Sequence, residues 1–295
     1  AFYLMSFLRT LLILGRVSNL PTVWTNVAVG WFLCGGGWTA ELGWIVAGIS
    51  LLYVGGMTMN DAFDAKWDQE NAPERPIPAG QISHRATWAV YLAETVAGIA
   101  ILSRLTSVNE LLIGGLILSI TLYNILHKHW KGSVILMGLC RAFVYIAAGS
   151  AVATQTSSLE VATILFVVAG AVVLYIAGIT LAARNEHLDS PVGNSFLNRI
   201  LLMLPVLFPL LGFRTVPTNP LYIGVTAVGV IGAWAWIVLS RKALAEKIPR
   251  GIAFLIAGIA FYDAAILAFA DWRAAFAALA CFALTLGLQR VVPAT

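Results

Sequence analysis

The chain has 295 residues, of which 60% are hydrophobic and only 11% carry a charge. An average soluble domain has about 25% charged residues, so this composition excludes an ordinary soluble enzyme. The 18 Lys and Arg residues exceed the 14 Asp and Glu residues by only four, which excludes a strongly basic nucleic-acid-binding surface. The cysteines, at positions 34, 140 and 281, are too far apart for a disulfide framework or a metal-binding motif. With a mean hydropathy of +0.86, the sequence indicates an integral membrane protein.

Apolar runs long enough to cross a bilayer recur along the whole chain. We place them at residues 18–35, 42–60, 86–104, 109–126, 134–154, 160–182, 198–213, 221–240, 251–270 and 273–291. No run alternates polar and apolar residues as a barrel strand does, so each is predicted to be a helix. The last two runs are joined by a very short link, which leaves nine or ten helices open. The sequence thus predicts an all-α, polytopic transmembrane helical bundle that forms a single domain over residues 1–295.

The charged residues distinguish the two ends of this bundle. With the N-terminus inside, 14 of the 18 basic residues fall in inner segments, three fall in outer segments, and Arg141 lies within a helix. This positive-inside bias predicts which end faces the cytoplasm. All four histidines lie at that end, and half of the acidic residues lie there in two links. We therefore expect the chemically functional residues at the cytoplasmic face of a bacterial inner or plasma membrane, in the motif segments 60–85 and 183–199.

The link after the second run begins with the sequence NDAFDAKWD at residues 60–68. If the helix continues, Asn60, Asp64 and Asp68 stack on one face, where like charges repel unless a cation lies between them. Oxygen ligands without Cys or His suit Mg²⁺, which takes one or two carboxylates together with waters and phosphates. The alternative is a solvated acidic helix end, but acidic residues are favoured at helix N-termini and this cluster lies at a C-terminus.

A second, weaker cluster follows the sixth run, with the sequence RNEHLD at residues 184–189. Asn185 and Asp189 repeat the i, i+4 spacing of the first cluster. By itself this segment is equally consistent with a polar loop. Because it lies on the same membrane face as the first cluster, it is a candidate second arm of one metal site.

Several cations fall near the two acidic clusters. They are Arg75, Lys128, Arg184 and, within the fifth predicted helix, Arg141. A charge inside an apolar helix is costly and usually faces a partner or a water-filled cavity. Simple positive-inside topology is the alternative explanation for Arg75 and Lys128. Two acidic arms and several cations together favour a polyanionic ligand, and a diphosphate bridged by Mg²⁺ fits that description.

Aromatic residues near these charges are candidates to line an apolar cavity. Tyr145 lies one turn beyond Arg141, and Tyr53 lies about two turns before Asn60. Further candidates are Tyr123, Tyr175 and Trp24. Aromatic faces stabilise a carbocation by cation–π attraction, although most aromatic residues are expected to serve packing or to lie at the membrane interface.

These motifs resemble those of the UbiA superfamily of intramembrane prenyltransferases. The first cluster matches the NDxxDxxxD pattern of that family in full, and RPIPAG follows at residues 75–80. The RVSNLP sequence at residues 16–21 and the Tyr123-Asn124 pair are also similar, so the likeness extends from residue 16 to about residue 199. The RVSNLP sequence and ARNE at residues 183–186 are similar to the EboC-like branch.

The resemblance implies a helical bundle around a central cavity, with Mg²⁺-dependent transfer of an isoprenyl chain from a prenyl diphosphate to a small-molecule or lipid acceptor. The implied metal residues are Asn60, Asp64, Asp68, Asn185 and Asp189. The cations available to the diphosphate are Arg16, Arg75, Lys128, Arg141 and Arg184. With the aromatic candidates, the expected substrate cavity includes Asn19, Tyr53, Tyr123, Asn124 and Tyr145. Asn185 departs from the family, which usually has Asp there, and this predicts a weak second metal site.

The predicted chemistry is ionisation of an allylic diphosphate inside the membrane. Mg²⁺ and the cations neutralise the charge that grows on the departing diphosphate, and the apolar cavity excludes water. The acceptor then attacks C1 and loses a proton, for which Asp61 or Glu186 is a candidate base. The candidate catalytic carboxylates are Asp61, Asp64, Asp68, Glu186 and Asp189.

Two alternative functions remain open at the level of the sequence. A membrane terpene cyclase would ionise the same substrate without an external acceptor. A non-catalytic lipid-binding or transport protein would keep the scaffold without turnover, and Glu94 and Asp263 within the predicted spans would then provide an ion path. Transporters, however, place their key groups near the midplane, whereas here the polar residues gather at one surface.

Overall fold

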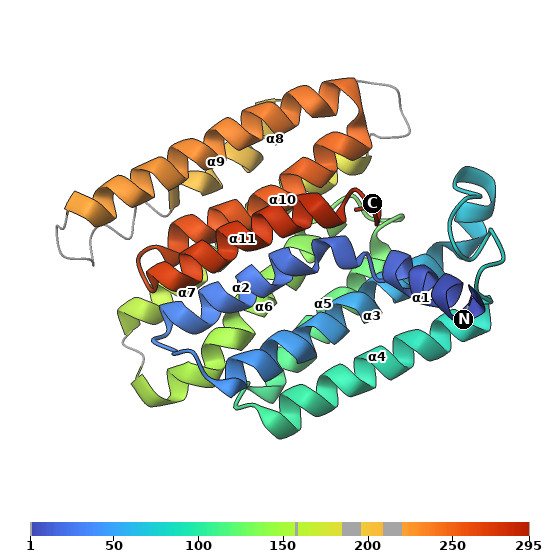
Figure 1. Ribbon diagram of the computed structural model, residues 1–295, viewed down its shortest axis with the longest axis horizontal. Coiled ribbons are helices and arrows are strands. Elements are labelled where there is room, and N and C mark those ends of the chain that lie inside the picture. The colour runs from blue at the N-terminus through green and yellow to red at the C-terminus, as the bar shows by residue number, and fades with distance from the viewer. Residues whose placement is uncertain (1, 157–158, 185–195, 209–219, 295) are drawn as a thin grey trace.

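The computed structural model describes residues 2–156, 159–184, 196–208 and 220–294. Throughout this part of the chain the regular structure is helical, and no strand occurs in it, so the predicted all-α fold is confirmed. The elements in chain order are α1 (Phe2–Leu14), the 3₁₀-helix η1 (Val17–Asn19), α2 (Leu20–Leu33), α3 (Ala40–Asn71), α4 (His84–Leu105), α5 (Glu110–Leu126), α6 (Ser133–Thr156), α7 (Leu159–Arg184), α8 (Phe196–Met203), α9 (Pro220–Glu246), α10 (Ile248–Leu267) and α11 (Trp272–Leu288) (Figure 1).

The predicted apolar runs correspond in order to helices α2–α11. Six of the described helices, α3, α4, α6, α7, α9 and α10, are long and apolar enough to cross a membrane. Helix α2 has 14 residues, and α5 and α11 have 17 each, which is at or below the lower limit for a span. Helix α8 covers only the first part of the predicted run 198–213. The total of nine or ten spans therefore stays a prediction.

Helix α3 carries the first acidic cluster as a continuation of a membrane-spanning helix. It has 32 residues, or about 48 Å at 1.5 Å per residue, whereas the hydrocarbon core of a bilayer is about 30 Å thick. No Gly or Pro interrupts residues 57–71, so the helix extends past the apolar core without a break. It ends at Ala72, whose N–H donates to the carbonyl of Asp68, directly before Pro73.

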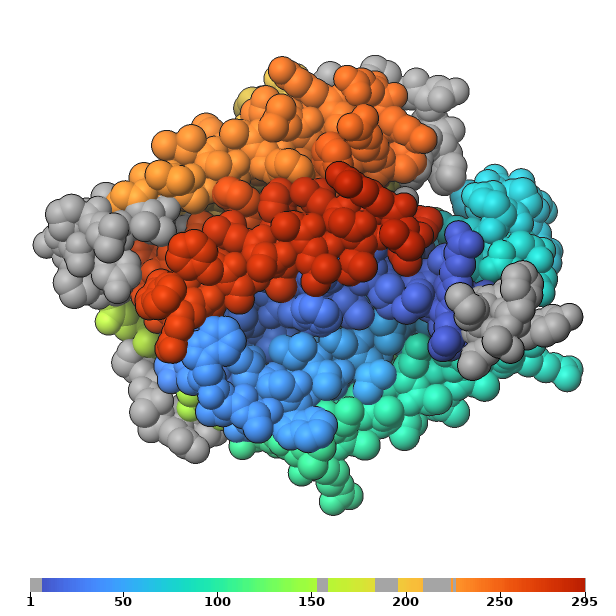
Figure 2. Space-filling view, in the orientation of Figure 1, coloured from blue at the N-terminus to red at the C-terminus, as the bar shows by residue number. Residues whose placement is uncertain are grey.

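Helix α2 lies inside the bundle, where it packs against α3, α6, α10 and α11 (Figure 1). It approaches α6 closely at Gly30, where an added Cβ would lie 2.0 Å from the carbonyl oxygen of Tyr145. Figure 2 shows α11, α2, α3 and α4 in succession across one face. Helix α4 packs mainly on α3 at the edge of the bundle, and only three of its 22 residues are buried. The side chains of α2 that face α6 and α10 are therefore buried within the bundle.

The segments that carry the predicted motifs lie near one end of the bundle. The C-terminal end of α3, the link at residues 72–83 and both marked chain ends lie at that end in Figure 1. The C-terminal residues pack on η1, where Asn19 Nδ2 donates to the carbonyl of Ala294 at 2.9 Å. Gln289 Nε2 in turn donates to Asn19 Oδ1 at 3.3 Å. Contacts from the opposite end of the chain thus hold the start of α2.

Candidate functional site

The acidic cluster of α3 is buried. The exposed fractions are 7% for Asn60, 5% for Asp61, 7% for Asp64 and 1% for Asp68. Buried carboxylates require partners that offset the loss of hydration. Each of the three carboxylates has a Lys or Arg side chain within 4 Å. The cluster is therefore a paired, buried charge network, and the alternative of a solvated helix end does not hold.

Arg75 closes the end of α3 that carries the cluster. Its Nη1 donates to both carboxylate oxygens of Asp68, at 3.1 and 3.0 Å, and lies 3.9 Å from Asp61 Oδ1. Burial disfavours the charge of Arg75, but the neighbouring carboxylates outweigh it and raise the pKa of the guanidinium above its ordinary value. Turns that follow Arg75 return the chain to the bundle, with the N–H of Ala79 donating to the carbonyl of Arg75 at 2.9 Å. Arg75 therefore stays charged beside the cluster.

Asp64 is paired with residues at the end of α5. Lys128 Nζ lies 2.7 Å from Asp64 Oδ1, and His127 Nε2 lies 3.3 Å from Oδ2. The other ring nitrogen of His127 lies 3.1 Å from the carbonyl oxygen of Asn124. The imidazole also stacks on the ring of Tyr123, with 5.3 Å between the ring centroids. The end of α5 thus holds one carboxylate of α3 with two side chains.

Arg16 and two asparagines complete the polar wall. Arg16 Nη2 lies 3.4 Å from Asn60 Oδ1 and 3.4 Å from Asp61 Oδ1. Asn60 Nδ2 donates to Asn124 Oδ1 at 2.9 Å, and Asn124 Nδ2 donates to the carbonyl of Gly56 at 3.3 Å. Arg16 itself has a φ of 43°, in the left-handed region that non-glycine residues seldom occupy. The chain is thus bent sharply where it presents this arginine to α3.

These polar groups border a partly open cavity of about 270 Å³ that lies between α3, α5, α6, α7 and α10. The predicted residues in its lining are Arg16, Asn19, Tyr53, Asn60, Asp64, Arg75, Tyr123 and Arg141. The opposite wall consists largely of aliphatic side chains from α7 and α10, among them Ile176, Ile179, Ile256 and Ile259. The cavity therefore has one highly charged side and one apolar side.

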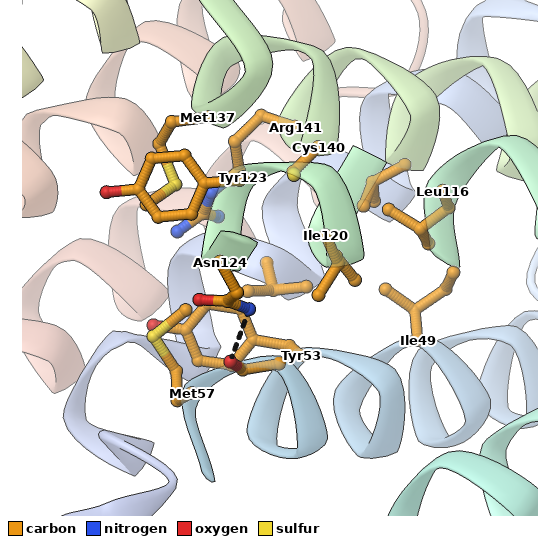
Figure 3. Close-up of a pocket in the computed structure, with 13 residues that line it drawn as sticks. Ile49, Tyr53, Met57, Leu116, Ile120, Tyr123, Asn124, Met137, Cys140 and Arg141 are labelled. Atoms are coloured by element: carbon orange, nitrogen blue, oxygen red, sulfur yellow. Dashed lines mark hydrogen bonds between the residues drawn. The ribbon is translucent and has the colours of Figure 1, made fainter. Parts of the chain in front are cut away.

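A smaller pocket of about 50 Å³ lies next to this cavity, between α2, α3, α5 and α6 (Figure 3). The two share the side chains of Tyr53, Met57, Tyr123, Met137 and Arg141. The remaining lining is almost entirely apolar and includes Ile49, Leu116, Ile120 and Val144. In Figure 3, Arg141 and Tyr123 lie toward one end of the pocket and Ile49 and Leu116 toward the other. A charged chamber is thus joined to an apolar recess within the bundle.

The other predicted residues lie outside the lining of the larger cavity. Asp61, Asp68 and Lys128 lie behind it, in contact with residues that form it. Asn124 lines the smaller pocket. Tyr145, predicted to line the cavity, belongs to neither lining, because its side chain is fully buried and its hydroxyl donates to Asp263 at 2.5 Å.

The two remaining aromatic candidates serve packing. The hydroxyl of Tyr175 donates to the carbonyl of Leu255 at 2.9 Å, and the indole N–H of Trp24 donates to Ser50 Oγ at 3.0 Å. Neither side chain lines the cavity or the smaller pocket. Their positions along the predicted helices were too weak a signal to separate such residues from cavity residues.

The predicted second arm lies outside the described residues. Asn185, Glu186 and Asp189 fall in the undescribed segment 185–195, and Arg184 is the last residue of α7. Thr180 and Ala183, in the last turns of that helix, line the cavity. Helix α7 therefore ends beside the cavity, and the contribution of its following segment stays a prediction.

The donors on the charged side are chemically suited to Mg²⁺. Asn60 and Asp64 line the cavity, and their side chains carry an amide oxygen and carboxylate oxygens. Hard oxygen ligands of this kind are those Mg²⁺ prefers alongside waters and phosphates. In the part of the chain with described side chains, no three His, Cys, Asp or Glu residues converge as a metal site. The donors therefore fit a Mg²⁺ ion whose coordination is completed by the phosphates of a bound ligand and by water, and not by protein side chains alone.

Sequence reasoning missed two groups beside the cavity. His127, which contacts Asp64, was noted only for its place at the inner end. Asn26, whose oxygen accepts from Arg141 at 2.7 Å, lies inside an apolar run and carried no signal of its own. Asn26 and Arg141 are 115 positions apart in the sequence, so their contact can be identified only when the packing of α2 against α6 is known.

Comparison with known proteins places this arrangement in a family. A model described as the UbiA prenyltransferase family matches residues 19–193, which is more than half of the chain and includes the acidic cluster. The chain belongs to the UbiA prenyltransferase family. The resemblance seen in the sequence motifs is thereby confirmed, while the likeness to the EboC-like branch stays a prediction.

Curated relatives of this UbiA-family protein include two digeranylgeranylglyceryl phosphate synthases. The protein from Saccharolobus solfataricus is 34% identical over 97 residues, which is 32% of this chain and 34% of the relative. The protein from Methanoculleus marisnigri is 33% identical over 92 residues, which is 31% of this chain and 33% of the relative. The matched region thus spans about a third of the length of either relative.

Solved structures share the fold over most of its length. A UbiA homolog from Aeropyrum pernix K1 has a TM-score of 0.63 and 18% identity, covering 86% of this chain and 98% of the homolog. A structure described as giving structural and mechanistic insights into the biosynthesis of digeranylgeranylglyceryl phosphate synthase in membranes has a TM-score of 0.60 and 17% identity. It covers 95% of this chain and 99% of that chain. At these identities the likeness establishes the fold.

Proposed function

We propose that this UbiA-family protein is a Mg²⁺-dependent intramembrane prenyltransferase, which transfers an isoprenyl chain from a prenyl diphosphate to a small-molecule or lipid acceptor. The observation that carries the proposal is that a charged cavity adjoins an apolar recess, and that five side chains line both. A prenyl diphosphate has the same two parts, a polyanionic head and an apolar tail. Family membership supports the reaction class.

The charged side of the cavity suits the diphosphate head. Arg16, Arg75 and Arg141 line it, and a guanidinium donates paired hydrogen bonds to phosphate oxygens. Mg²⁺, held by Asn60 and Asp64 with Asp68 close behind, would supply further neutralisation of the leaving group. Arg16 and Arg75, which form ion pairs with carboxylates of α3, would also contact the diphosphate.

The apolar side suits the isoprenyl chain and the reacting carbon. Tyr53 and Tyr123 lie where the cavity meets the recess, so their rings can face a developing allylic cation. The C1–O bond breaks with its electron pair on the diphosphate, the acceptor forms a bond to C1, and the acceptor loses a proton. Asp61 is poorly placed to accept that proton, because Arg16 and Arg75 lie next to it and it does not line the cavity.

The class of acceptor is suggested by the relatives. Both proteins described above are named as synthases of digeranylgeranylglyceryl phosphate. The aliphatic wall of α7 and α10 offers a second apolar surface beside the charged one. We therefore propose an acceptor with a polar group near C1 and an apolar body, which a membrane lipid provides.

Turnover of labelled prenyl diphosphates by the purified full chain tests the proposal. Farnesyl and geranylgeranyl diphosphate would be supplied with Mg²⁺, with and without a total membrane lipid fraction as the acceptor pool. We expect diphosphate release and a prenylated lipid only when the lipid fraction is present. A cyclised hydrocarbon without lipid would support the terpene cyclase, and binding of the chain without turnover would support a lipid-binding protein.

A further inference from the structure

A buried polar network lies behind the cavity wall, where α2, α6 and α10 meet. Asp263 on α10 and Asn26 on α2 are both fully buried. Asn26 Nδ2 donates to Asp263 Oδ2 at 2.7 Å, and the hydroxyl of Tyr145 donates to Oδ1 at 2.5 Å. Thr25 Oγ1 lies 2.5 Å from Oδ2. The carboxyl group of Asp263 thus has three polar neighbours from two other helices.

The network reaches the cavity through one arginine. Arg141 Nη1 donates to Asn26 Oδ1 at 2.7 Å, and Arg141 lines both the cavity and the smaller pocket. Arg16 and Arg75 form ion pairs with carboxylates of α3, whereas Arg141 forms no ion pair with any described residue. Its hydrogen-bond partner in the described part of the chain is the neutral amide of Asn26.

The chemistry of these groups fixes the orientation of the Asn26 amide. A guanidinium only donates hydrogen bonds, so Arg141 requires the amide oxygen. The amide nitrogen then points to the carboxyl group of Asp263 and also lies 3.0 Å from the hydroxyl oxygen of Tyr145. Turning the amide over would oppose donor to donor at Arg141 and acceptor to acceptor at Asp263. In a buried site both contacts would be strongly unfavourable.

We infer that Asp263 is a positioning residue for the diphosphate site, because it orients the Asn26 amide that holds Arg141 at the cavity wall. The inference rests on the proposed function, since Arg141 is a diphosphate ligand only if the cavity takes a prenyl diphosphate. The carboxylate also offsets the cost of keeping an arginine inside an apolar helix. Asp263 thereby has a role in the site without forming part of an ion path.

Binding of inorganic diphosphate in the presence of Mg²⁺ tests the inference. Calorimetric titration of the purified full chain would compare wild type with Asp263→Asn, Arg141→Gln and the double variant. Asp263→Asn keeps the size of the side chain but replaces one acceptor oxygen with an NH₂ donor. An NH₂ group that faces Asn26 would oppose the Asn26 nitrogen and favour the turned-over amide. We expect each single variant to bind about 10-fold more weakly, as for loss of one hydrogen bond to a charged group. The double variant should bind no more weakly than Arg141→Gln, because both changes remove the same contact, that between Arg141 and the diphosphate.

Thr25→Val is the matched control. It removes a hydroxyl that touches the same oxygen of Asp263 but leaves the link from Asn26 to Arg141 in place. Its diphosphate affinity should stay within about twofold of wild type even where its thermal stability falls. If Asp263→Asn does not fold, Asn26→Ala interrupts the same link and should give the same loss as Arg141→Gln.

The outcomes separate this inference from the proposed function. Unchanged or tighter binding by Asp263→Asn would overturn the inference, because Asp263 would then act only as a counter-charge to Arg141. Additive losses in the double variant would also overturn it, because Asp263 would then act independently of Arg141. Wild-type protein that neither binds diphosphate nor turns over a prenyl diphosphate would overturn the proposed function and the inference together.

Discussion

At the scale of single residues, the acidic cluster of α3 is stabilised by cations from distant parts of the chain. Asp61, Asp64 and Asp68 would repel one another on an isolated helix. In the folded protein Arg16 pairs with the first, Lys128 with the second and Arg75 with the third. Removing one carboxylate therefore leaves a partly buried cation without its partner. We expect this loss to outweigh the relief of repulsion between the carboxylates, so that the protein becomes less stable.

Asp68→Asn should lower the thermal stability of the Mg²⁺-free protein. Arg75 would keep one hydrogen bond to the amide oxygen at position 68, but its only remaining ion pair with a described residue would be the longer one with Asp61. Removal of one partner of a buried ion pair is destabilising. The side chain of Arg75 is 29% exposed, so we expect a loss of about 1 kcal/mol, well below the value for a fully buried pair. Melting curves in detergent would measure it. Glu70→Gln makes the same charge change at an exposed position of α3 and should have little effect. A melting temperature for Asp68→Asn equal to or higher than that of wild type would contradict the pairing argument.

Asp64→Asn should abolish prenyl transfer, with a loss of at least about 100-fold in turnover on the scale of a lost electrostatic contribution to the transition state. Asp64 is the one carboxylate of the cluster that lines the cavity. The variant keeps a side chain of the same shape, so it should still fold. Initial rates with labelled prenyl diphosphate would be compared with those of Glu70→Gln. Normal turnover by Asp64→Asn would show that the acidic face of α3 does not hold the metal.

At the scale of elements, the crossing of α2 and α6 decides where the polar network forms. Gly30 allows the two backbones to touch, and it lies one turn from Asn26 on α2. Tyr145 on α6 supplies both the carbonyl that faces Gly30 and the hydroxyl that binds Asp263. A change in this crossing would therefore move the network and loosen the packing together.

Gly30→Ala should destabilise the protein by about 1–3 kcal/mol, the usual cost of inserting a group into a full core. The added Cβ would meet a carbonyl oxygen, which cannot move without the helix. Gly170→Ala on α7 is the control, because a Cβ there has open space, and it should stabilise by about 0.5–1 kcal/mol. Thermal melting of both variants would check the pair, and a stable Gly30→Ala would mean that α2 and α6 lie farther apart.

Helix α11 begins with a capping residue whose contribution should depend on pH. Asp271 accepts hydrogen bonds from the N–H groups of Arg273 and Ala274, at 2.7 and 3.1 Å. Burial raises the pKa of Asp271, but hydrogen bonds to the carboxylate outweigh it and lower the pKa below its ordinary value. Because the folded-state pKa is the lower one, ionised Asp271 stabilises the fold above the unfolded value, and this contribution is lost as the pH falls through the folded value.

Asp271→Ala should therefore cost about 1 kcal/mol near neutral pH, and the difference from wild type should shrink below about pH 4. Asp271→Asn retains a capping oxygen and should lie between the two at neutral pH. Melting temperatures of the three proteins across this range would test the assignment. A difference between wild type and Asp271→Ala that does not vary with pH would rule out the ionised cap as its source.

At the scale of the whole molecule, the charge bias predicts that the end carrying the acidic cluster faces the cytoplasm. A single cysteine at Glu74, in the link after α3, should be labelled only from the cytoplasmic side. One at Ser107, in the link after α4, should be labelled only from the opposite side. Both positions are exposed, and the native Cys140 and Cys281 would first be replaced by Ala. Labelling of the two from the same side, or in the reverse order, would contradict the topology.

The sequence by itself determined the class of fold and the residues of the first motif. Apolar runs separated by short polar links predict helices, because inside a bilayer a helix satisfies its own backbone. The spacing of Asn60, Asp64 and Asp68 predicted a shared face, because the period of a helix is local. Both predictions depend on neighbours along the chain, and both agree with the structure of α3.

Only the tertiary structure decided which charges meet and which helix faces line the cavity. Tyr145 and Arg141 lie one turn apart on α6, yet Arg141 reaches the cavity and Tyr145 turns toward Asp263. The partner of Arg141 is Asn26, 115 positions away in the sequence. Such pairings depend on how α2, α6 and α10 pack, and helix packing is set by side-chain shapes along whole interfaces. A local pattern carries too little information to fix them.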